Sequence, residues 1–141
     1  MLYYERINYM ILSKNAEKIL KELNEKSNEF KSKKNTKDYV SPFDAVFSFS
    51  DIQKLLPQES YISLRGILNY LLKEKYIYNN IQDKEDYISH RDVDEDTVQI
   101  FIGEKGIAYL NQKKYILLAK VIPLFTASLS LLLSLITFIF K

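Results

Sequence analysis

The longest apolar segment of the chain is residues 121–140, VIPLFTASLSLLLSLITFIF. It contains no Asp, Glu, Lys, Arg, His, Asn or Gln, whereas apolar and polar residues are interleaved before it. A helix rises about 1.5 Å per residue, so this segment covers roughly 30 Å, the thickness of the hydrocarbon core of a bilayer. The rest of the chain is too small to bury a helix that is apolar on every face. The pattern therefore predicts a transmembrane helix at 121–140 that acts as a C-terminal tail anchor.

Basic residues flank this predicted span unequally. Lys113, Lys114 and Lys120 precede it, and Lys141 follows it. Because short loops rich in Lys and Arg are retained on the cytoplasmic side, we expect a single-pass protein of the inner (plasma) membrane. Its first 112 residues (1–112) then form a cytoplasmic domain in contact with membrane lipid, and 113–120 forms a basic juxtamembrane helix.

Helical periodicity predicts an amphipathic helix in the N-terminal part, with Ser13 as its N-cap. The pairs Glu17–Lys21 and Glu22–Lys26 are expected on its outer face, at the i,i+4 spacing of ion pairs. Residues 2–12 form either a shorter preceding helix or the start of the same one. The lysines of 31–37 lack apolar periodicity and predict a loop, which is solvated or lies against nucleic acid or anionic lipid. The apolar face of the helix consists of Leu12, Ala16, Ile19, Leu20 and Leu23.

The middle of the chain predicts a helix-turn-helix followed by a hairpin. A short extended segment at 46–49 leads to a helix at 51–56, capped by Ser50 or Asp51 and ended by Pro57. A longer helix follows at 59–75, with its leucines on one face. Strands are expected at 76–78 and 97–102, with a long polar tip between them. A helix from 104 to 120 then continues into the span.

The passage 101–110, FIGEKGIAYL, resembles the strand and x-x-G-x-x-x-L helix that follow the wing in many winged-helix regulators, including MarR-like and PadR-like families. The element order over roughly residues 10 to 115 is also similar to that of a winged-helix (winged helix-turn-helix) domain. No specific family is indicated. The resemblance implies an α+β, mainly helical fold: a winged-helix-like domain with a β-hairpin wing, followed by one C-terminal transmembrane helix. It also implies that 59–75 is a recognition helix whose outer face is Tyr61, Arg65, Asn69 and Lys73.

The distribution of charge helps to distinguish DNA binding from protein interaction as the function of such a domain. Arg65 and Asn69 suit guanine and adenine edges, and Lys73 suits a phosphate. The expected wing, 83–96, nevertheless has a net charge of −5 and would be repelled by a phosphate backbone. We therefore expect a protein-interaction or sensing module with an unidentified cytoplasmic protein partner. A membrane-tethered DNA-binding regulator is the alternative.

Hydroxyl residues recur along one face of the predicted span. They are small enough for helices to approach closely and exchange hydrogen bonds, which predicts a homo-oligomer. Two alternatives stay open: each hydroxyl bonds its own helix and the span is only an anchor, or several copies line a polar path. The last alternative would make the protein a small membrane-perturbing or pore-forming effector of a microbial defence system. The residues of this hydroxyl stripe are Thr126, Ser130, Ser134 and Thr137.

Composition argues against catalysis. The chain has no cysteine, three glycines and one histidine, His90, which excludes a disulfide scaffold, a thiolate nucleophile and a multi-histidine metal site. The acidic run 92–96 lacks the glycine and the final glutamate of a calcium-binding EF-hand. We therefore expect a protein that is not an enzyme, with no catalytic residues, no cofactor and no metal site.

Overall fold

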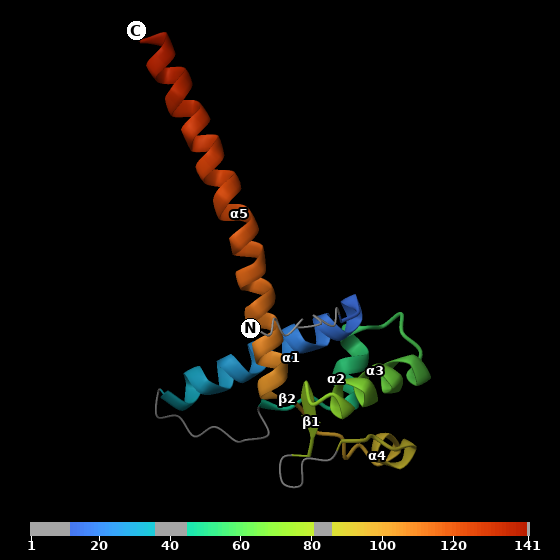
Figure 1. Ribbon diagram of the computed structural model, residues 1–141. Helices are drawn as coiled ribbons and strands as arrows, with labels where there is room; N and C mark the ends of the chain where they lie inside the picture. Colours follow the sequence, from blue (N-terminus) through green and yellow to red (C-terminus); the bar gives the residue numbers. More distant parts are fainter. Residues whose placement is uncertain (1–11, 36–44, 81–85, 141) are drawn as a thin grey trace, which may run out of the picture.

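The described residues of the computed structural model are 12–35, 45–80 and 86–140. They form a mainly helical domain with a small two-stranded antiparallel sheet, from which one long apolar helix projects (Figure 1). The predicted helix or helix start at 2–12 falls almost entirely outside these residues. The described elements are α1 (Lys14–Asn35), α2 (Phe49–Leu55), α3 (Tyr61–Lys73), β1 (Ile77–Asn79), α4 (His90–Asp94), β2 (Ile100–Ile102) and α5 (Glu104–Ile139).

Helix α1 begins where the sequence predicts it and ends later. The backbone N–H of Ala16 donates to Oγ of Ser13 at 3.2 Å, which confirms Ser13 as the cap. The loop predicted from Lys31 is wrong as far as Asn35, because the helix continues through these lysines. No glycine or proline interrupts them, and Lys33 and Lys34 in the last turn are favoured by the negative end of the helix dipole.

Helices α2 and α3 are fixed by local hydrogen bonds at their ends. Helix α2 starts at Phe49 because Ser48 and Asp51 form a capping box, so the prediction of Ser50 or Asp51 as the cap is wrong. Ser60 caps α3 through the N–H of Ser63. The end of α3 is a Schellman motif, with Lys75 at φ 62°.

The sheet is shorter than predicted. Strands β1 and β2 pair antiparallel, with Ile77 opposite Ile102 and Asn79 opposite Ile100. Phe47 forms an isolated bridge to Ile100, with both N–H···O distances 2.8 Å, so the extended segment expected at 46–49 reduces to one bridging residue. The polar connection between the strands contains the short helix α4, which the sequence did not predict.

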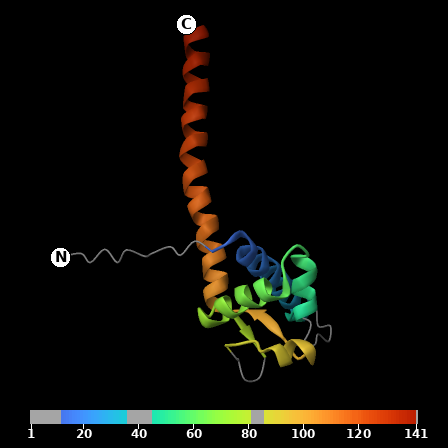
Figure 2. The same ribbon diagram turned by 90° about the vertical axis from the view of Figure 1, so that its right-hand side faces the viewer.

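The core of the domain lies between α1, α3 and the sheet, and α5 begins against it. Ile19, Leu20 and Leu23 of α1 are fully buried together with leucines of α3 and isoleucines of both strands. Gly106 of α5 is buried in the same place, and Ile107 and Leu110 pack on the core. From Lys113 to Ile139 every residue of α5 is exposed. Figure 2 shows this part of the helix projecting away from the domain. A single helix thus belongs first to the domain and then to the apolar segment.

Candidate functional site

The face of α3 predicted for recognition is turned toward the β1–β2 connection. Tyr61 shares a 2.7 Å hydrogen bond with Nδ1 of His90, and the two rings stack with centroids 5.1 Å apart. Arg65 lies over the ring of Tyr61, 5.8 Å from its centroid, and is half-buried. Lys73 is exposed. The structure therefore brings Tyr61 and Arg65 together, with His90 as a third partner, and leaves Lys73 apart from them.

Asn69 is bonded to the backbone of the same connection. Its Oδ1 accepts from the N–H of Ile88 at 2.8 Å, and its Nδ2 donates to the carbonyl of Ile88 at 3.4 Å. Ile88 is fully buried, so these are the groups that satisfy its backbone. The amide of Asn69 thus attaches the connection to α3.

The acidic residues around α4 have local structural partners. Ser89 caps α4, and Asp92 accepts from both the N–H and the hydroxyl of Ser89, at 2.7 and 2.6 Å. These hydrogen bonds, from the side chain first and then from the backbone, hold the pKa of Asp92 below its ordinary value. Arg91 forms an ion pair with Glu95 at 2.6 Å. Among the described residues, no group of three or more His, Cys, Asp or Glu could hold a metal ion.

The outward face of α3 carries a different set of side chains. Ile62 is 73% exposed and Tyr70 is 38% exposed. Gly66 lies between them at helical spacing, and nothing would lie within 4 Å of a Cβ added there. This face therefore presents two apolar side chains on either side of an open notch. Exposed apolar side chains of this kind suit contact with another protein better than contact with phosphates.

A second site lies where α1 crosses α5. The carboxylate of Glu17 receives a hydrogen bond from Nζ of Lys113 at 2.5 Å and lies 3.4 Å from Nζ of Lys21. The i,i+4 pair with Lys21 is confirmed, but the prediction that Glu17 lies on the outer face is wrong, because the residue is only 8% exposed. Packing of α5 against α1 covers it. The pair joins residues 96 positions apart in the chain.

The electrostatics of this pair favour both charges. Burial by itself raises the pKa of Glu17, but the hydrogen bonds and positive charges of Lys113 and Lys21 outweigh it, so the pKa is lowered. The hydrogen bond to Glu17 raises the pKa of Lys113. Both groups are therefore ionised at neutral pH.

A groove of about 370 Å³ opens beside this ion pair. One wall comes from α1 and the other from α5. All three predicted juxtamembrane lysines belong to it. Its lining comprises Glu17, Lys21, Leu110, Lys113, Lys114, Ile116, Leu117 and Lys120.

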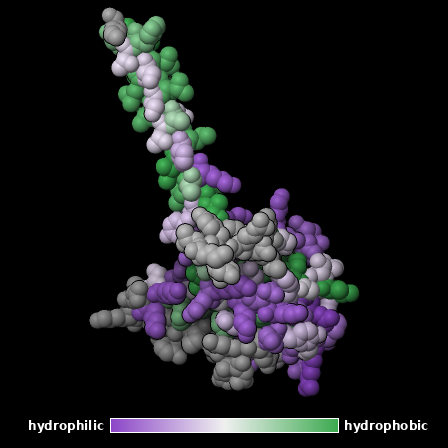
Figure 3. Space-filling model, in the orientation of Figure 1, coloured by the Kyte–Doolittle hydropathy of each residue, from purple (hydrophilic) through white to green (hydrophobic). Residues whose placement is uncertain are grey.

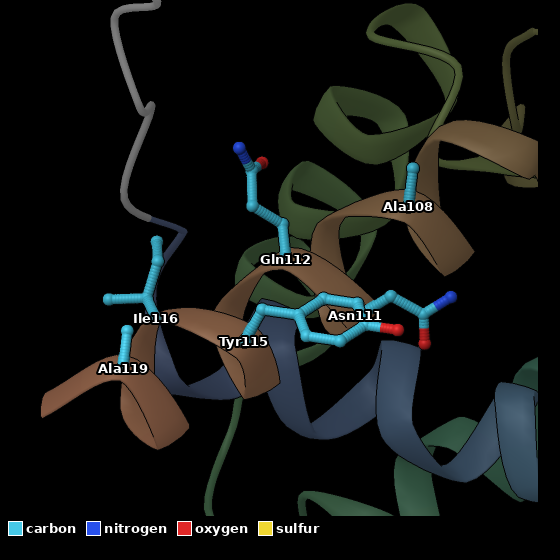
Figure 4. Close-up of a pocket in the computed structure, with 6 residues that line it drawn as sticks. All are labelled: Ala108, Asn111, Gln112, Tyr115, Ile116 and Ala119. Carbon is cyan, nitrogen blue, oxygen red and sulfur yellow. The ribbon is translucent and has the colours of Figure 1, made fainter. Parts of the chain in front are cut away.

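A shallower hollow lies along another face of α5. Its volume is about 620 Å³, and its labelled side chains follow successive turns of the helix (Figure 4). Tyr115, which is 70% exposed, is the largest of them. None of the residues that line it carries a charge. The lining residues are Ala108, Asn111, Gln112, Tyr115, Ile116 and Ala119.

Beyond the domain, α5 is long and apolar enough to cross a membrane, and none of its most apolar stretch is buried against the domain. Figure 3 shows hydrophilic side chains gathered at the domain and around the departure of the helix, with hydrophobic side chains beyond. The predicted hydroxyl stripe lies in this part. Ser130 and Ser134 donate to carbonyls one turn earlier at 2.9 Å, and Thr126 and Thr137 do the same. Each hydroxyl oxygen still has lone pairs that can accept a hydrogen bond from a neighbouring helix.

Sequence reasoning missed the contributions of Glu17 and Lys21 to the α1–α5 junction. A weak signal exists, because Glu17 directly follows Ala16 and lies at the edge of the apolar face of its helix. Nothing in the local pattern indicates that Lys113, far along the chain, is its partner. The lysines of α5 were identified from charge alone, and the groove that contains them depends on tertiary packing.

No family model, curated protein or solved structure matches this chain.

Proposed function

We propose that this protein is a single-pass membrane protein whose winged-helix-like domain is a cytoplasmic protein-interaction module, and that copies associate through α5. The observation that carries the proposal is the continuity of α5. One helix is anchored in the domain core by Gly106, Ile107 and Leu110 and then runs, fully exposed and apolar, far enough to cross a bilayer. Interactions of the domain would thereby take place at the membrane surface.

Charge supports the orientation. Lys113, Lys114 and Lys120 lie at the end of the apolar segment that is nearest the domain. Because basic residues are retained on the cytoplasmic side, this asymmetry supports a cytoplasmic position of the domain. Tyr115 lies at the same end, where an amphipathic ring is favoured at the membrane interface.

The arrangement of elements supports the winged-helix-like assignment. Helices α2 and α3 form the helix-turn-helix, and β1 and β2 form the hairpin that would be the wing. The bridge from Phe47 adds a third extended segment beside β2. Helix α4 in the connection would be an elaboration of the wing.

Two observations favour a protein partner over DNA. The side chain on α3 best suited to an adenine edge, Asn69, is bonded to Ile88, and Tyr61 of the same face is bonded to His90. The outward face instead offers Ile62 and Tyr70, which can bury apolar area against a partner protein. The acidic residues near α4 would also repel phosphates.

Self-association is supported by the continuity of one face of α5. The small and polar positions Ala108, Tyr115 and Ala119 lie in helical register with Thr126 and Ser130. The face therefore extends from the domain into the apolar segment. A second copy could pack along its whole length.

The proposal is tested on the full chain in cells. A photoreactive amino acid is placed at Ile62, with Glu25, an exposed residue of α1, as the matched control position. We expect the protein to resist carbonate extraction from membranes and position 62, but not position 25, to crosslink to one defined protein. Recovery in the aqueous fraction would contradict the anchor. A low-salt gel shift with the detergent-purified chain, lost as salt increases, would favour the DNA-binding alternative.

A further inference from the structure

We propose that the groove between α1 and α5 is a binding site for the phosphate-bearing headgroup of an acidic phospholipid. The inference deepens the proposed function and rests on it, because the lipid would belong to the membrane that α5 crosses. The groove has a volume of about 370 Å³ and is lined by residues of both helices.

The charge of the groove suits an anion. Its lining contains four lysines and one acid, Glu17. Glu17 forms ion pairs with Lys113 and Lys21. Among the described residues, no acid forms an ion pair with Lys114 or Lys120. These two ammonium groups therefore lack a negative partner in the part of the chain that the structure describes. The oxygens of a lipid phosphate accept charge-assisted hydrogen bonds from such groups.

The position of the groove matches the depth of the headgroups. Lys120 is adjacent to the first residue of the apolar segment, Val121, and Lys114 lies about 9 Å further from it along the helix. The polar layer on each side of a bilayer is roughly 5–8 Å thick. The two lysines thus lie at either side of that layer. Their aliphatic stems can lie along α5 while the ammonium groups reach the phosphate.

The apolar lining suits the rest of the lipid. Leu117 is 63% exposed, and Ile116 next to it is 39% exposed. Both line the groove between the two lysines along α5. The glycerol region and the start of an acyl chain can cover them, which removes apolar surface from water.

Helix α1 makes this a groove rather than a row of juxtamembrane lysines. It crosses α5 where α5 leaves the domain (Figure 1), and the hydrogen bond from Lys113 to Glu17 holds the two helices together there. Lys21 then adds a positive charge from the second wall. A headgroup would be contacted from two sides. We therefore expect the protein to prefer acidic lipid even in detergent, where there is no charged bilayer surface.

Native mass spectrometry of the full chain in a neutral detergent tests this directly. The probes are dioleoylphosphatidylglycerol, dioleoylphosphatidylcholine and inorganic phosphate. We expect phosphatidylglycerol to bind at a lower lipid concentration than phosphatidylcholine does, and inorganic phosphate to bind little. The variant K114Q/K120Q should lose this preference on the order of tenfold, and K114R/K120R should retain it. The control K31Q/K34Q removes the same charge from exposed positions of α1 and should behave as the unaltered chain.

Each contrary result has a distinct meaning. Equal binding of both lipids, or a preference unchanged in K114Q/K120Q, overturns the inference and leaves the proposed function intact. Loss of the preference in K31Q/K34Q instead would assign it to the lysines at the end of α1, which also overturns the inference. Binding of inorganic phosphate as tight as that of lipid would identify a soluble anion as the ligand, which overturns the inference. Failure of the chain to insert into vesicles of either lipid overturns the proposed function itself.

Discussion

At the scale of single residues, Glu17 shows how one carboxylate joins distant parts of the chain. It is buried at the edge of the core, yet it remains charged because Lys113 and Lys21 surround it. Burying a charged group without a partner is strongly unfavourable, so the carboxylate requires α5 to pack at this position. Lys113 is 54% exposed, and solvent screening reduces what the pair contributes to stability.

Replacing Glu17 tests this pair. E17Q should lower the free energy of unfolding at pH 7 by about 1 kcal/mol, because Lys113 and Lys21 lose their charged partner. A carboxyl whose pKa is lowered in the fold stabilises it above the unfolded-state pKa, and this contribution disappears as pH falls through the folded-state pKa. The difference between the two proteins should therefore vanish in acid.

Urea unfolding of the full chain in detergent, followed by circular dichroism at pH 7, 5 and 3, measures the effect. E25Q, at an exposed position of the same helix, is the control and should match the unaltered chain at each pH. Equal stability of E17Q and the unaltered chain at pH 7 would contradict the role assigned to the pair.

At the scale of elements, the approach of α5 to the sheet decides how the domain is closed. A Cβ added at Gly106 would lie 2.5 Å from the carbonyl oxygen of Tyr76 and 3.0 Å from Ile102. The same carbonyl accepts from the N–H of Gly103 at 2.9 Å, so it is held in place. Gly106 belongs to the segment 101–110, which resembles the passage after a wing. In this structure the position requires glycine, because a side chain would collide with the carbonyl of Tyr76.

Two glycine substitutions separate steric requirement from helix propensity. G106A should destabilise the domain by about 2 kcal/mol, since a fixed backbone carbonyl blocks the added methyl group. G66A should instead stabilise it by about 1 kcal/mol, because alanine favours a helix and the space around Gly66 is open. Unfolding midpoints in urea compare them. Similar effects of the two changes would show that α5 does not pack as closely as the structure has it.

The element boundaries also show what local sequence can indicate. The Ser13 cap was predictable because it depends only on the next three residues. The capping box at Ser48 and Asp51 is equally local and was missed because Phe47 and Phe49 alternate with polar residues like a strand. By contrast, the attachment of the β1–β2 connection to α3 through Asn69 and Ile88 depends on tertiary packing, and no periodicity indicates it.

At the scale of the whole molecule, the main feature is α5, which is long and apolar enough to cross a membrane. It has 36 residues, which at 1.5 Å per residue is about 54 Å, longer than a hydrocarbon core requires. The excess lies in the domain and in the groove region. Two copies that associate through the span would therefore also bring their domains together.

Association through the hydroxyl stripe is testable with a matched control in the same helix. S130L/S134L should weaken self-association about tenfold, because in the proposed assembly each serine would leave space for a neighbouring helix and its hydroxyl oxygen would accept a hydrogen bond from that helix. S128L changes a serine that bonds its own helix in the same way, at 2.9 Å to Leu124, but faces away from the stripe. It should leave association unchanged.

Analytical ultracentrifugation of the full chain in density-matched detergent gives the oligomer size and its dissociation constant. A strictly monomeric unaltered chain would favour the anchor without association. Equal weakening by S128L would show that helix packing in general, rather than the stripe, is responsible.

The sequence alone determined the apolar helix, the Ser13 cap, the apolar face of α1 and the basic residues before the apolar segment. These properties depend on composition and on contacts within a few residues, which the linear pattern contains. Only the tertiary structure decided that Glu17 is covered by α5, that Asn69 holds the β1–β2 connection, and that Lys21 and Lys120 share one groove. Each of these depends on residues far apart in the chain being brought together by burial of the core, and hydrophobic burial has no direction that a local pattern could reveal.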